Sequence, residues 1–373
     1  MLLVATERRG DSSEWARIAE DLRRDITVGK LTPGDKIGSE TDLAQQYRVS
    51  RMTVHRALSE LRDAGLVVRR PRAGTIVAGR APAPEPAVRN VALVFYNAHV
   101  YPQANYLRGI QAALSDDDRA VLMDTRDDPR REAELLRRAA EEADAIFIYP
   151  TCAAENTELL TEISSRLPVV CLDRVPMGIP LDAVVSDNYE ASRKALQALI
   201  DRGHRRIAHF TDSQLAVSTV QERMAAHRDA LRGIGVDPRP LERMFPTSYG
   251  WDFSMFVRAI GDALHLLRSG PEPVTAAFCL HDQYMAATLA ACESMGLRVP
   301  EDFEIASFHD SPSLPVANLD AVERIVPRIF EIGRMAAERL RERRRNPEAP
   351  PRVTSVPSDV LAARPSGTVR ILV

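Results

Sequence analysis

The first residues whose types and spacing suggest chemistry lie in the stretch SRMTVHR at 50–56. Ser50 is a residue type that caps helices, and Val54 belongs to an apolar stripe that would face a core. Arginine pairs bidentately with guanine, and hydroxyls and helix N-termini bind phosphates. The pattern predicts contacts with nucleic acid, and its alternative is a small helical bundle with a solvated basic face. The polar side chains in question are Arg51, Thr53, His55 and Arg56.

Three helices and a hairpin would hold these residues in place. An apolar stripe at helical spacing predicts a first helix over about 15–26. The second helix is expected to begin at Ser39, whose hydroxyl caps it. The side chain of Asp42, at the third position, would in return accept a hydrogen bond from the Ser39 backbone amide. Gly65 ends the third helix, and a hairpin over 66–77 follows, so the order is that of a helix-turn-helix with a wing. The expected inward-facing residues are Trp15, Ile18, Ala19, Leu22, Ile26, Leu43, Ala44, Tyr47, Val54, Ala57, Leu58 and Leu61.

Behind this head, apolar runs alternate with amphipathic stretches. Runs such as 91–96, 145–149 and 168–172 are apolar throughout, which is typical of strands buried on both faces of a parallel sheet. The stretch 79–90 contains three prolines and no apolar periodicity, and it predicts a semi-extended linker. The fold class is therefore α/β, with an N-terminal winged helix-turn-helix and a body of two lobes.

The expected boundaries follow from these changes of pattern. The winged helix would occupy 1–78, the linker 79–90 and the effector-binding and dimerisation body 91–373. Within the body, one lobe would comprise about 91–185 and 315–348, and the other about 186–314 and 349–373.

Composition narrows the function classes. Residues 1–80 carry a net charge of +4 and the remainder −7, so a basic head precedes an acidic body. The four cysteines are scattered and no run of 18 apolar residues occurs, so we expect a cytoplasmic protein without disulfides, a zinc site or a membrane span. Catalytic and cofactor motifs are absent, so we expect neither an enzyme nor a cofactor. The arginine-rich stretch 341–346 is expected to be a solvated helix end.

The segment from Ile18 to Ala78 resembles the GntR-type winged helix over essentially its whole length, including its S-R-x-T-V motif at 50–54. The resemblance implies that the start of the second helix, this motif and the Gly-Thr of the wing lie at the DNA. Arginine is common in the family where this chain has Thr41 and His55, which implies an atypical operator. The expected DNA contacts are Ser39, Glu40, Thr41, Ser50, Arg51, Thr53, His55, Arg56, Arg72, Gly74 and Thr75.

The body resembles the LacI/GalR regulators and the related periplasmic sugar-binding proteins from about residue 90 to 345. The match is strongest at 168–174, 183–210, 220–236 and 275–310. It implies a small ligand held between two lobes by carboxylates, an arginine fork and an aromatic platform. The expected effector contacts are Tyr101, Asp173, Arg174, Arg223, Trp251, His281, Asp282, His309 and Asp310.

Several of these positions keep a structural alternative or depart from the family. Alternatively, Asp282 only caps its helix, and Trp251 belongs to the hydrophobic core. His281 stands where the family often has Asn, and His309 where it often has Asp. The usual T-T-V-x-Q-P stretch is DAVERIVP at 320–327, so the return crossover is expected to be unusual.

The resemblances together imply a transcriptional regulator similar to the arabinose-repressor-like group. We expect a homodimeric repressor that binds an inverted-repeat operator and is released by a small sugar, a pentose or hexose. One alternative is a corepressor-type regulator that binds a purine or nucleoside. A second alternative, of a different class, is a sugar-binding protein or enzyme with an incidental basic head.

Overall fold

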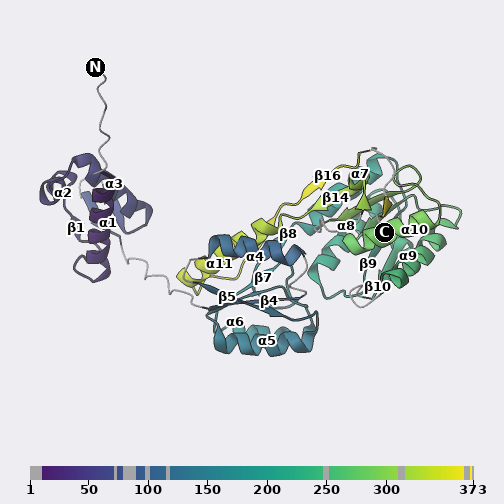
Figure 1. The fold of residues 1–373 in the computed structure, drawn as a ribbon, viewed down its shortest axis with the longest axis horizontal. Coiled ribbons are helices and arrows are strands. Elements are labelled where there is room, and N and C mark those ends of the chain that lie inside the picture. Colours follow the sequence, from purple (N-terminus) through teal and green to yellow (C-terminus); the bar gives the residue numbers. More distant parts are fainter. Residues whose placement is uncertain are drawn as a thin grey trace, which may run out of the picture. The chain divides into compact units, whose positions relative to one another are not determined.

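The structure is a computed structural model that describes residues 11–70, 74–78, 90–96, 101–114, 118–246, 252–309, 316–364 and 370–371. The chain divides into two compact units, Met1–Pro86 and Ala87–Val373, which are called the head and the body below. Both are drawn as ribbons in Figure 1.

The head consists of three helices and a three-stranded antiparallel sheet in the order β1-β3-β2. The predicted inner stripes of the first and third helices are confirmed, because their aliphatic members are all buried in one core while Trp15 packs at its edge. An ion pair between Arg23 and Glu60, 2.9 Å long, joins the first helix to the third. The elements are α1 (Asp11–Thr27), β1 (Lys36–Ile37), α2 (Glu40–Tyr47), α3 (Arg51–Asp63), β2 (Val67–Arg70) and β3 (Gly74–Val77).

The first lobe of the body, the N-lobe, is a parallel sheet in the order β15-β8-β7-β6-β4-β5. Helices α4 and α11 cover one face and α5 and α6 the other (Figure 1). Strands β6 and β7 are buried along their whole length, as expected for a sheet between two helical layers. The bounds are β4 (Asn90–Phe95), α4 (Tyr101–Ala113), β5 (Arg119–Asp124), α5 (Pro129–Glu142), β6 (Ala145–Ile148), η1 (Ala154–Asn156), α6 (Thr157–Ser164), β7 (Val169–Leu172), β8 (Asp182–Ser186), α11 (Ile329–Arg345) and β15 (Val353–Val356).

The second lobe, the C-lobe, is a sheet in the order β10-β9-β11-β12-β14-β16, in which only β16 is antiparallel to its neighbour. Helices α7 and α8 pack against each other, and so do α9 and α10. The bounds are α7 (Asn188–Asp201), β9 (Ile207–Asp212), α8 (Ser218–Gly233), η2 (Arg239–Leu241), β10 (Glu242–Phe245), α9 (Phe253–Arg268), β11 (Ala276–Cys279), α10 (Asp282–Ser294), β12 (Glu304–Phe308), β13 (Val316–Ala317), η4 (Leu319–Ala321), β14 (Glu323–Val326), β16 (Asp359–Leu361) and β17 (Arg370–Ile371).

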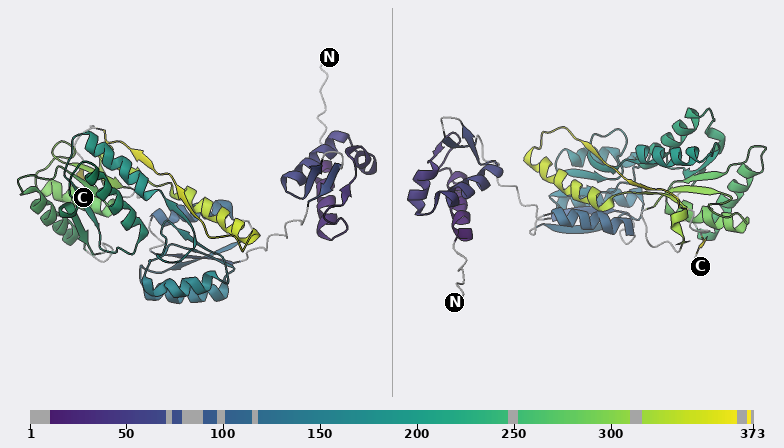
Figure 2. Two further views of the ribbon diagram at one scale, coloured as in Figure 1. Left: turned by 180° about the vertical axis from the view of Figure 1, so that it is seen from behind. Right: turned by 90° about the horizontal axis from the view of Figure 1, so that it is seen from above.

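The chain passes between the lobes three times: after β8, after β14 and between β15 and β16 (Figure 2). Strand β14 therefore belongs to the C-lobe sheet, and β15 to the N-lobe sheet. The expected division, with 315–348 in the first lobe and 349–373 in the second, is wrong at these two strands. The cause is the short return of the chain through β15, which pairs with β8, before β16 goes back to pair with β14.

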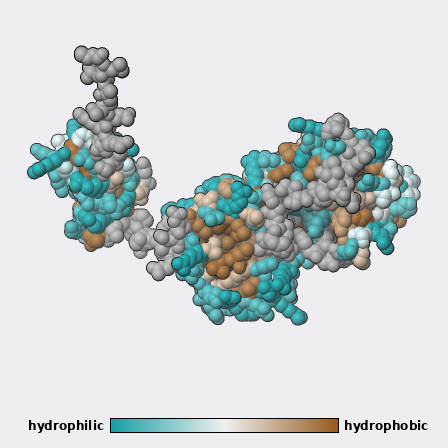
Figure 3. Space-filling model, viewed as in Figure 1, coloured by the Kyte–Doolittle hydropathy of each residue, from teal (hydrophilic) through white to brown (hydrophobic). Residues whose placement is uncertain are grey.

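Two features of the described surface bear on function. Strand β5 lies at the edge of the N-lobe sheet and leaves Val121 and Leu122 44% and 46% exposed. Figure 3 shows apolar side chains gathered on the N-lobe. Among the described helices, none combines the length and the hydrophobicity needed to cross a bilayer.

Candidate DNA interface and effector site

The start of α3 is fixed by a side-chain cap. The Ser50 hydroxyl accepts a hydrogen bond from the backbone amide of Thr53 at 3.1 Å and lies 2.7 Å from the Thr53 hydroxyl. Thr53 is only 4% exposed, and its side chain helps to stabilise the start of the helix. Its expected contact with DNA stays a prediction.

The outward face of α3 carries Arg51, Met52, His55 and Arg56, all exposed. Met52 is the most exposed large apolar side chain of the described residues, at 74%, and our sequence analysis missed it. Its position next to Arg51, in the first turn of the predicted recognition helix, is the sequence feature that points to an exposed side chain. The Arg56 guanidinium lies 4.6 Å from the centre of the Trp15 ring, so this cation is packed against α1.

The start of α2 faces the same helix. Ser39 and Asp42 form the predicted capping box, with the Ser39 hydroxyl accepting from the Asp42 amide and the Asp42 carboxylate accepting from the Ser39 amide. Thr41 is exposed. The Glu40 carboxylate lies 3.0 Å from Nδ1 of His55 on α3. That hydrogen bond holds the pKa of Glu40 below its ordinary value.

The wing is described from Gly74 onward. Gly74 has a φ of +86°, and a Cβ there would lie 3.3 Å from Cε of Lys36, so a side chain at this position would be strained. Thr75 is half-buried and pairs across the sheet with Ile37 and Arg69. Arg72, which the sequence predicts at the wing tip, lies outside the described residues.

In the body, the predicted carboxylate Asp173 follows β7 directly and adopts a positive φ of 59°. Its Oδ1 accepts from the Ser186 hydroxyl at 2.7 Å, and its Oδ2 lies 3.4 Å from the Tyr149 hydroxyl. Asp173 is 7% exposed, and its Oδ1 also accepts from the Ser186 amide at 3.3 Å.

The next residue, Arg174, lies where the two lobes meet. Its guanidinium stacks over the rings of Tyr149 and Tyr96 at 4.7 and 5.1 Å. One terminal nitrogen donates to the carbonyl of Pro150 at 3.4 Å, and the buried Nε has no hydrogen-bond partner among the described residues. The following amide, of Val175, donates to the Ser218 hydroxyl of the C-lobe at 3.0 Å. The Nε donor of Arg174 is therefore buried and unpaired among the described residues, close to the junction of the lobes.

Arg223 on α8 is held inside the C-lobe. It donates through Nε and Nη2 to Oδ1 of Asn188 at 3.0 and 2.8 Å, and through Nη1 to the Leu280 carbonyl at 2.6 Å. Its guanidinium also stacks 3.4 Å from the centre of the Phe308 ring. With 8% exposure, Arg223 ties α7, α8 and the end of β11 together, and a large part of its donor capacity is used inside the protein.

The start of α10 brings three predicted residues together. Oδ1 of Asp282 lies 2.6 Å from Nδ1 of His309, and Asp282 is 6% exposed. His281 caps the helix by accepting from the Gln283 amide. Burial lowers the pKa of His281 to about 3, helped by the positive charge of Arg223, so this imidazole is neutral.

Three further carboxyl groups interact through their charges with these residues, and the sequence motifs did not point to them. Burial raises the pKa of Asp127; the Arg174 charge opposes this rise, and the Asp212 charge adds to it. Burial also raises the pKa of Glu222, with a further contribution from Asp173. Asp127 follows β5 by three residues and Asp212 is the last residue of β9, so the carboxyl ends of these strands are the sequence feature that points to them. We call the following group the interlobe cluster: Asp127, Asp173, Arg174, Asp212, Glu222, Arg223, His281, Asp282 and His309.

Three predicted effector contacts cannot be placed. Trp251 and Asp310 lie outside the described residues, and so does the side chain of Tyr101, whose backbone begins α4. Within the part of the chain that the structure describes, no group of three or more potential ligands is arranged to hold a metal ion.

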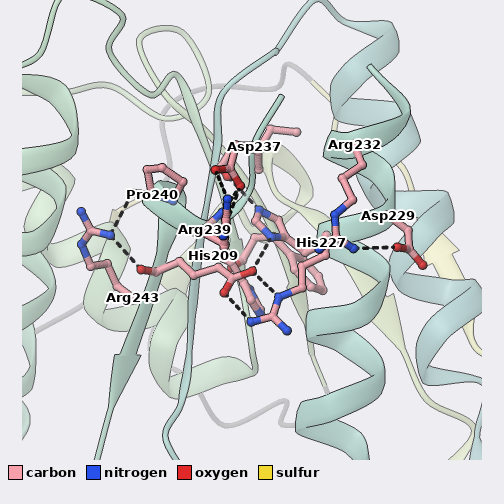
Figure 4. Close-up of polar contacts among 12 residues, drawn as sticks. His209, His227, Asp229, Arg232, Asp237, Arg239, Pro240 and Arg243 are labelled. Carbon is pink, nitrogen blue, oxygen red and sulfur yellow. Dashed lines mark hydrogen bonds and ion pairs between the residues drawn. The ribbon is translucent and has the colours of Figure 1, made fainter. Parts of the chain in front are cut away.

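A second polar group in the C-lobe has a structural role. His209 and His227 are fully buried and stack with ring centres 5.0 Å apart, near the Glu242 carboxylate (Figure 4). Burial lowers the pKa of His227 to about 4 and that of His209 well below its ordinary value. Nδ1 of His209 donates to the Phe278 carbonyl at 3.0 Å, and Nε2 of His227 donates to the Ile207 carbonyl at 2.9 Å. Both imidazoles are neutral, so the pair packs in the core and is not a ligand site.

Comparison with known proteins assigns both units. Residues 15–77 match the bacterial regulatory proteins of the gntR family, and residues 196–366 match the periplasmic binding protein-like domain. The chain joins a GntR-type head to a periplasmic-binding-protein-like body. The predicted combination is thereby confirmed, and the regulator carries a DNA-binding head.

The regulator's relatives span most of its length. It is 25% identical to the arabinose metabolism transcriptional repressor of Geobacillus stearothermophilus, over 88% of this chain and 90% of that protein. It is 24% identical to the transcriptional regulator GntR of Escherichia coli K12, over 84% and 93%.

Solved structures confirm the fold of the regulator. The complex of the regulator CelR with cellobiose superposes with a TM-score of 0.63 at 22% identity, covering 84% of this chain and 90% of that one. The regulator CcpA of Lactococcus lactis gives a TM-score of 0.63 at 22% identity, covering 74% and 98%.

Proposed function

We propose that this protein is a homodimeric, cytoplasmic repressor that binds an inverted-repeat operator and is released by a small neutral sugar. The observation that carries the proposal is the interlobe cluster in the same chain as a capped recognition helix. In the cluster, the Nε of Arg174 is buried without a hydrogen-bond partner among the described residues. Carboxyl groups at the ends of strands of both lobes interact with this arginine or with its neighbours. Binding energy at such a cluster can change how the lobes are oriented, and a head on the same chain can transmit that change to DNA.

A dimer is supported by the size of the head and by the surface of the body. One winged helix covers one half-site, so a full operator requires two copies. The edge strand β5 exposes Val121 and Leu122, and an apolar edge of this kind is an aggregation liability unless it is covered. We infer that a second copy of the body covers it, because homo-oligomers of this kind are usually closed by a two-fold axis.

The charges of the interlobe cluster support an uncharged effector. Five carboxyl groups accompany only two arginines. Even without Asp127 and Glu222, whose pKa burial raises, three carboxylates remain, and Arg223 has already committed donors to Asn188 and a carbonyl. An anionic ligand would be repelled by this excess, whereas the hydroxyls of a neutral sugar donate to carboxylates and accept from Arg174. We therefore favour a neutral pentose or hexose over a sugar acid or a sugar phosphate.

Operator binding with and without sugars tests the function. The full chain is used to select operator sequences from random DNA, and the selected DNA is titrated alone and with L-arabinose, D-ribose, D-xylose, D-glucose or D-galactose. Matched D-gluconate, D-galacturonate and D-glucose 6-phosphate are compared in parallel, and adenosine represents nucleosides. We expect an inverted repeat and release by one neutral sugar. Tighter binding with adenosine would support the corepressor alternative, and selection of no sequence would exclude an operator-binding repressor.

Arg51→Ala is expected to weaken specific operator binding by roughly 1–3 kcal/mol, because it removes a guanidinium that can bind a base edge bidentately from the start of the recognition helix. Arg62→Ala, in the last turn of the same helix, is the matched control and should change affinity by less than about 1 kcal/mol. Fluorescence anisotropy with labelled operator and with scrambled DNA measures both. Unchanged discrimination between the two DNAs in Arg51→Ala would show that α3 does not enter the major groove as proposed.

A further inference from the structure

We propose that His55, held by Glu40, contacts the amino group of an adenine or cytosine in each operator half-site. The inference rests on the proposed operator binding and specifies part of the sequence that the head selects. Its basis is a contact between the two helices of the head that carry the expected DNA residues, since Glu40 begins α2 and His55 lies on α3.

His55 occupies the outward face of the recognition helix. The buried residues of α3 are Thr53, Val54, Ala57, Leu58 and Leu61, which lie on one side of the helix. His55 is on the opposite side, one helical turn after Arg51, and its side chain is 50% exposed. A helix that enters the major groove with its first turns would therefore bring this imidazole to the base edges.

Glu40 determines which ring nitrogen carries the hydrogen. The hydrogen bond from His55, with the positive charges of Arg69 and Arg51 nearby, holds the pKa of Glu40 below its ordinary value, so Glu40 is a carboxylate at neutral pH. A carboxylate only accepts hydrogen bonds, so Nδ1 of His55, 3.0 Å away, must be the donor. In the neutral imidazole this leaves Nε2 as an acceptor, and the tautomer is set by Glu40.

An acceptor at Nε2 discriminates between bases. In the major groove, adenine presents its N6 amino group and cytosine its N4 amino group, whereas guanine and thymine present acceptors at the corresponding positions. A neutral His55 with Nδ1 facing Glu40 can accept from adenine or cytosine, but it would leave two acceptors opposed at guanine or thymine. An arginine at this position would have the reverse preference, because its guanidinium only donates.

Site selection with the full chain tests this at about pH 8, above the ordinary pKa of a free histidine side chain. Wild-type protein should enrich adenine or cytosine at one position of each half-site. His55→Ala should lose the preference at that position alone, with about a tenfold loss of affinity. His55→Arg should change the preference to guanine, and Glu40→Ala, which frees the ring to donate from Nε2, should move it toward guanine or thymine.

Controls separate this inference from operator binding itself. Arg62→Ala should weaken binding evenly and keep the selected sequence, because Arg62 lies in the last turn of α3, where its guanidinium donates to the Ser59 hydroxyl. If His55→Ala or Glu40→Ala selects the same bases with the same preference as wild type, the inference is wrong while the repressor function stands. If no variant and no wild-type protein selects a sequence, both fail together.

Discussion

Gly333→Ala is expected to destabilise the body by about 3 kcal/mol, because two helices cross there with no room for a side chain. A Cβ at Gly333 on α11 would lie 2.2 Å from the carbonyl oxygen of Tyr106 on α4. At the same crossing, a Cβ at Gly109 on α4 would lie 2.0 Å from the carbonyl oxygen of Phe330. Both obstacles are backbone atoms, so a whole helix has to move.

Thermal unfolding of the full chain, followed by circular dichroism, measures this effect as a fall of roughly 5–10 °C in the Tm of the body. Gly261→Ala on α9 is the matched control. Its Cβ would meet only the Cβ of Ala291, at an ordinary 3.7 Å, and alanine favours helix. We expect that variant to be as stable as wild type or more stable, by about 0.5–1 kcal/mol. Equal stability of Gly333→Ala and wild type would contradict the close helix crossing.

The sequence predicted those features whose signal is local. The helix stripes of the head, the two capping serines and the buried strands of the body recur over a few residues, and the hydrophobic effect then decides which face turns inward. Resemblance pointed to Asp173, Arg174, Arg223, His281, Asp282 and His309 as effector contacts. The structure brings Asp282 and His309 within hydrogen-bond distance, and the role of these residues toward an effector stays a prediction.

Contacts between distant residues had no local signal. Asp182 accepts from Arg339 and Arg343, which are 157 and 161 residues away, and thereby fastens α11 to β8. The expectation of a solvated helix end is wrong at Arg343, whose side chain is 13% exposed in that contact. Similarly, the motif located Thr53 but could not show that its hydroxyl turns to Ser50, since the direction depends on how α3 packs in the head.

The interlobe cluster also limits how the effector signal can be transmitted. Arg174 stacks on two tyrosines of the N-lobe, and the adjacent Val175 amide bonds to Ser218 of the C-lobe. A ligand that uses the available donor of Arg174 and the carboxylates of the C-lobe therefore interacts with both lobes. Its binding energy depends on their relative orientation, which is the requirement for a coupled change.

A saturating effector is expected to weaken operator binding of the wild-type protein by at least about tenfold. A sugar that changes operator affinity must itself bind differently to the DNA-bound and free states. Closure of the two lobes in a dimer alters the spacing of the two heads, and heads set for half-sites one helical turn apart tolerate little change. Closure is therefore expected to disrupt a dimer that fits its operator.

Arg174→Met is expected to keep operator affinity and to abolish this release. Methionine preserves most of the packing on Tyr96 and Tyr149, while the loss of the cation costs about 1–2 kcal/mol at each ring. Arg166→Met removes an exposed arginine that follows α6 and pairs with Glu162, and this variant should respond to the sugar as wild type does.

Operator titrations of the three proteins, with and without the neutral sugar that releases wild type, decide the matter. Release of wild type and Arg166→Met but not of Arg174→Met is the expected result, and isothermal titration should show that Arg174→Met no longer binds the sugar. Tighter operator binding in the presence of the sugar would reverse the direction and make it a corepressor. If the sugar binds Arg174→Met as well as wild type, the effector does not use the donor at the junction of the lobes, and the interlobe cluster is not its site.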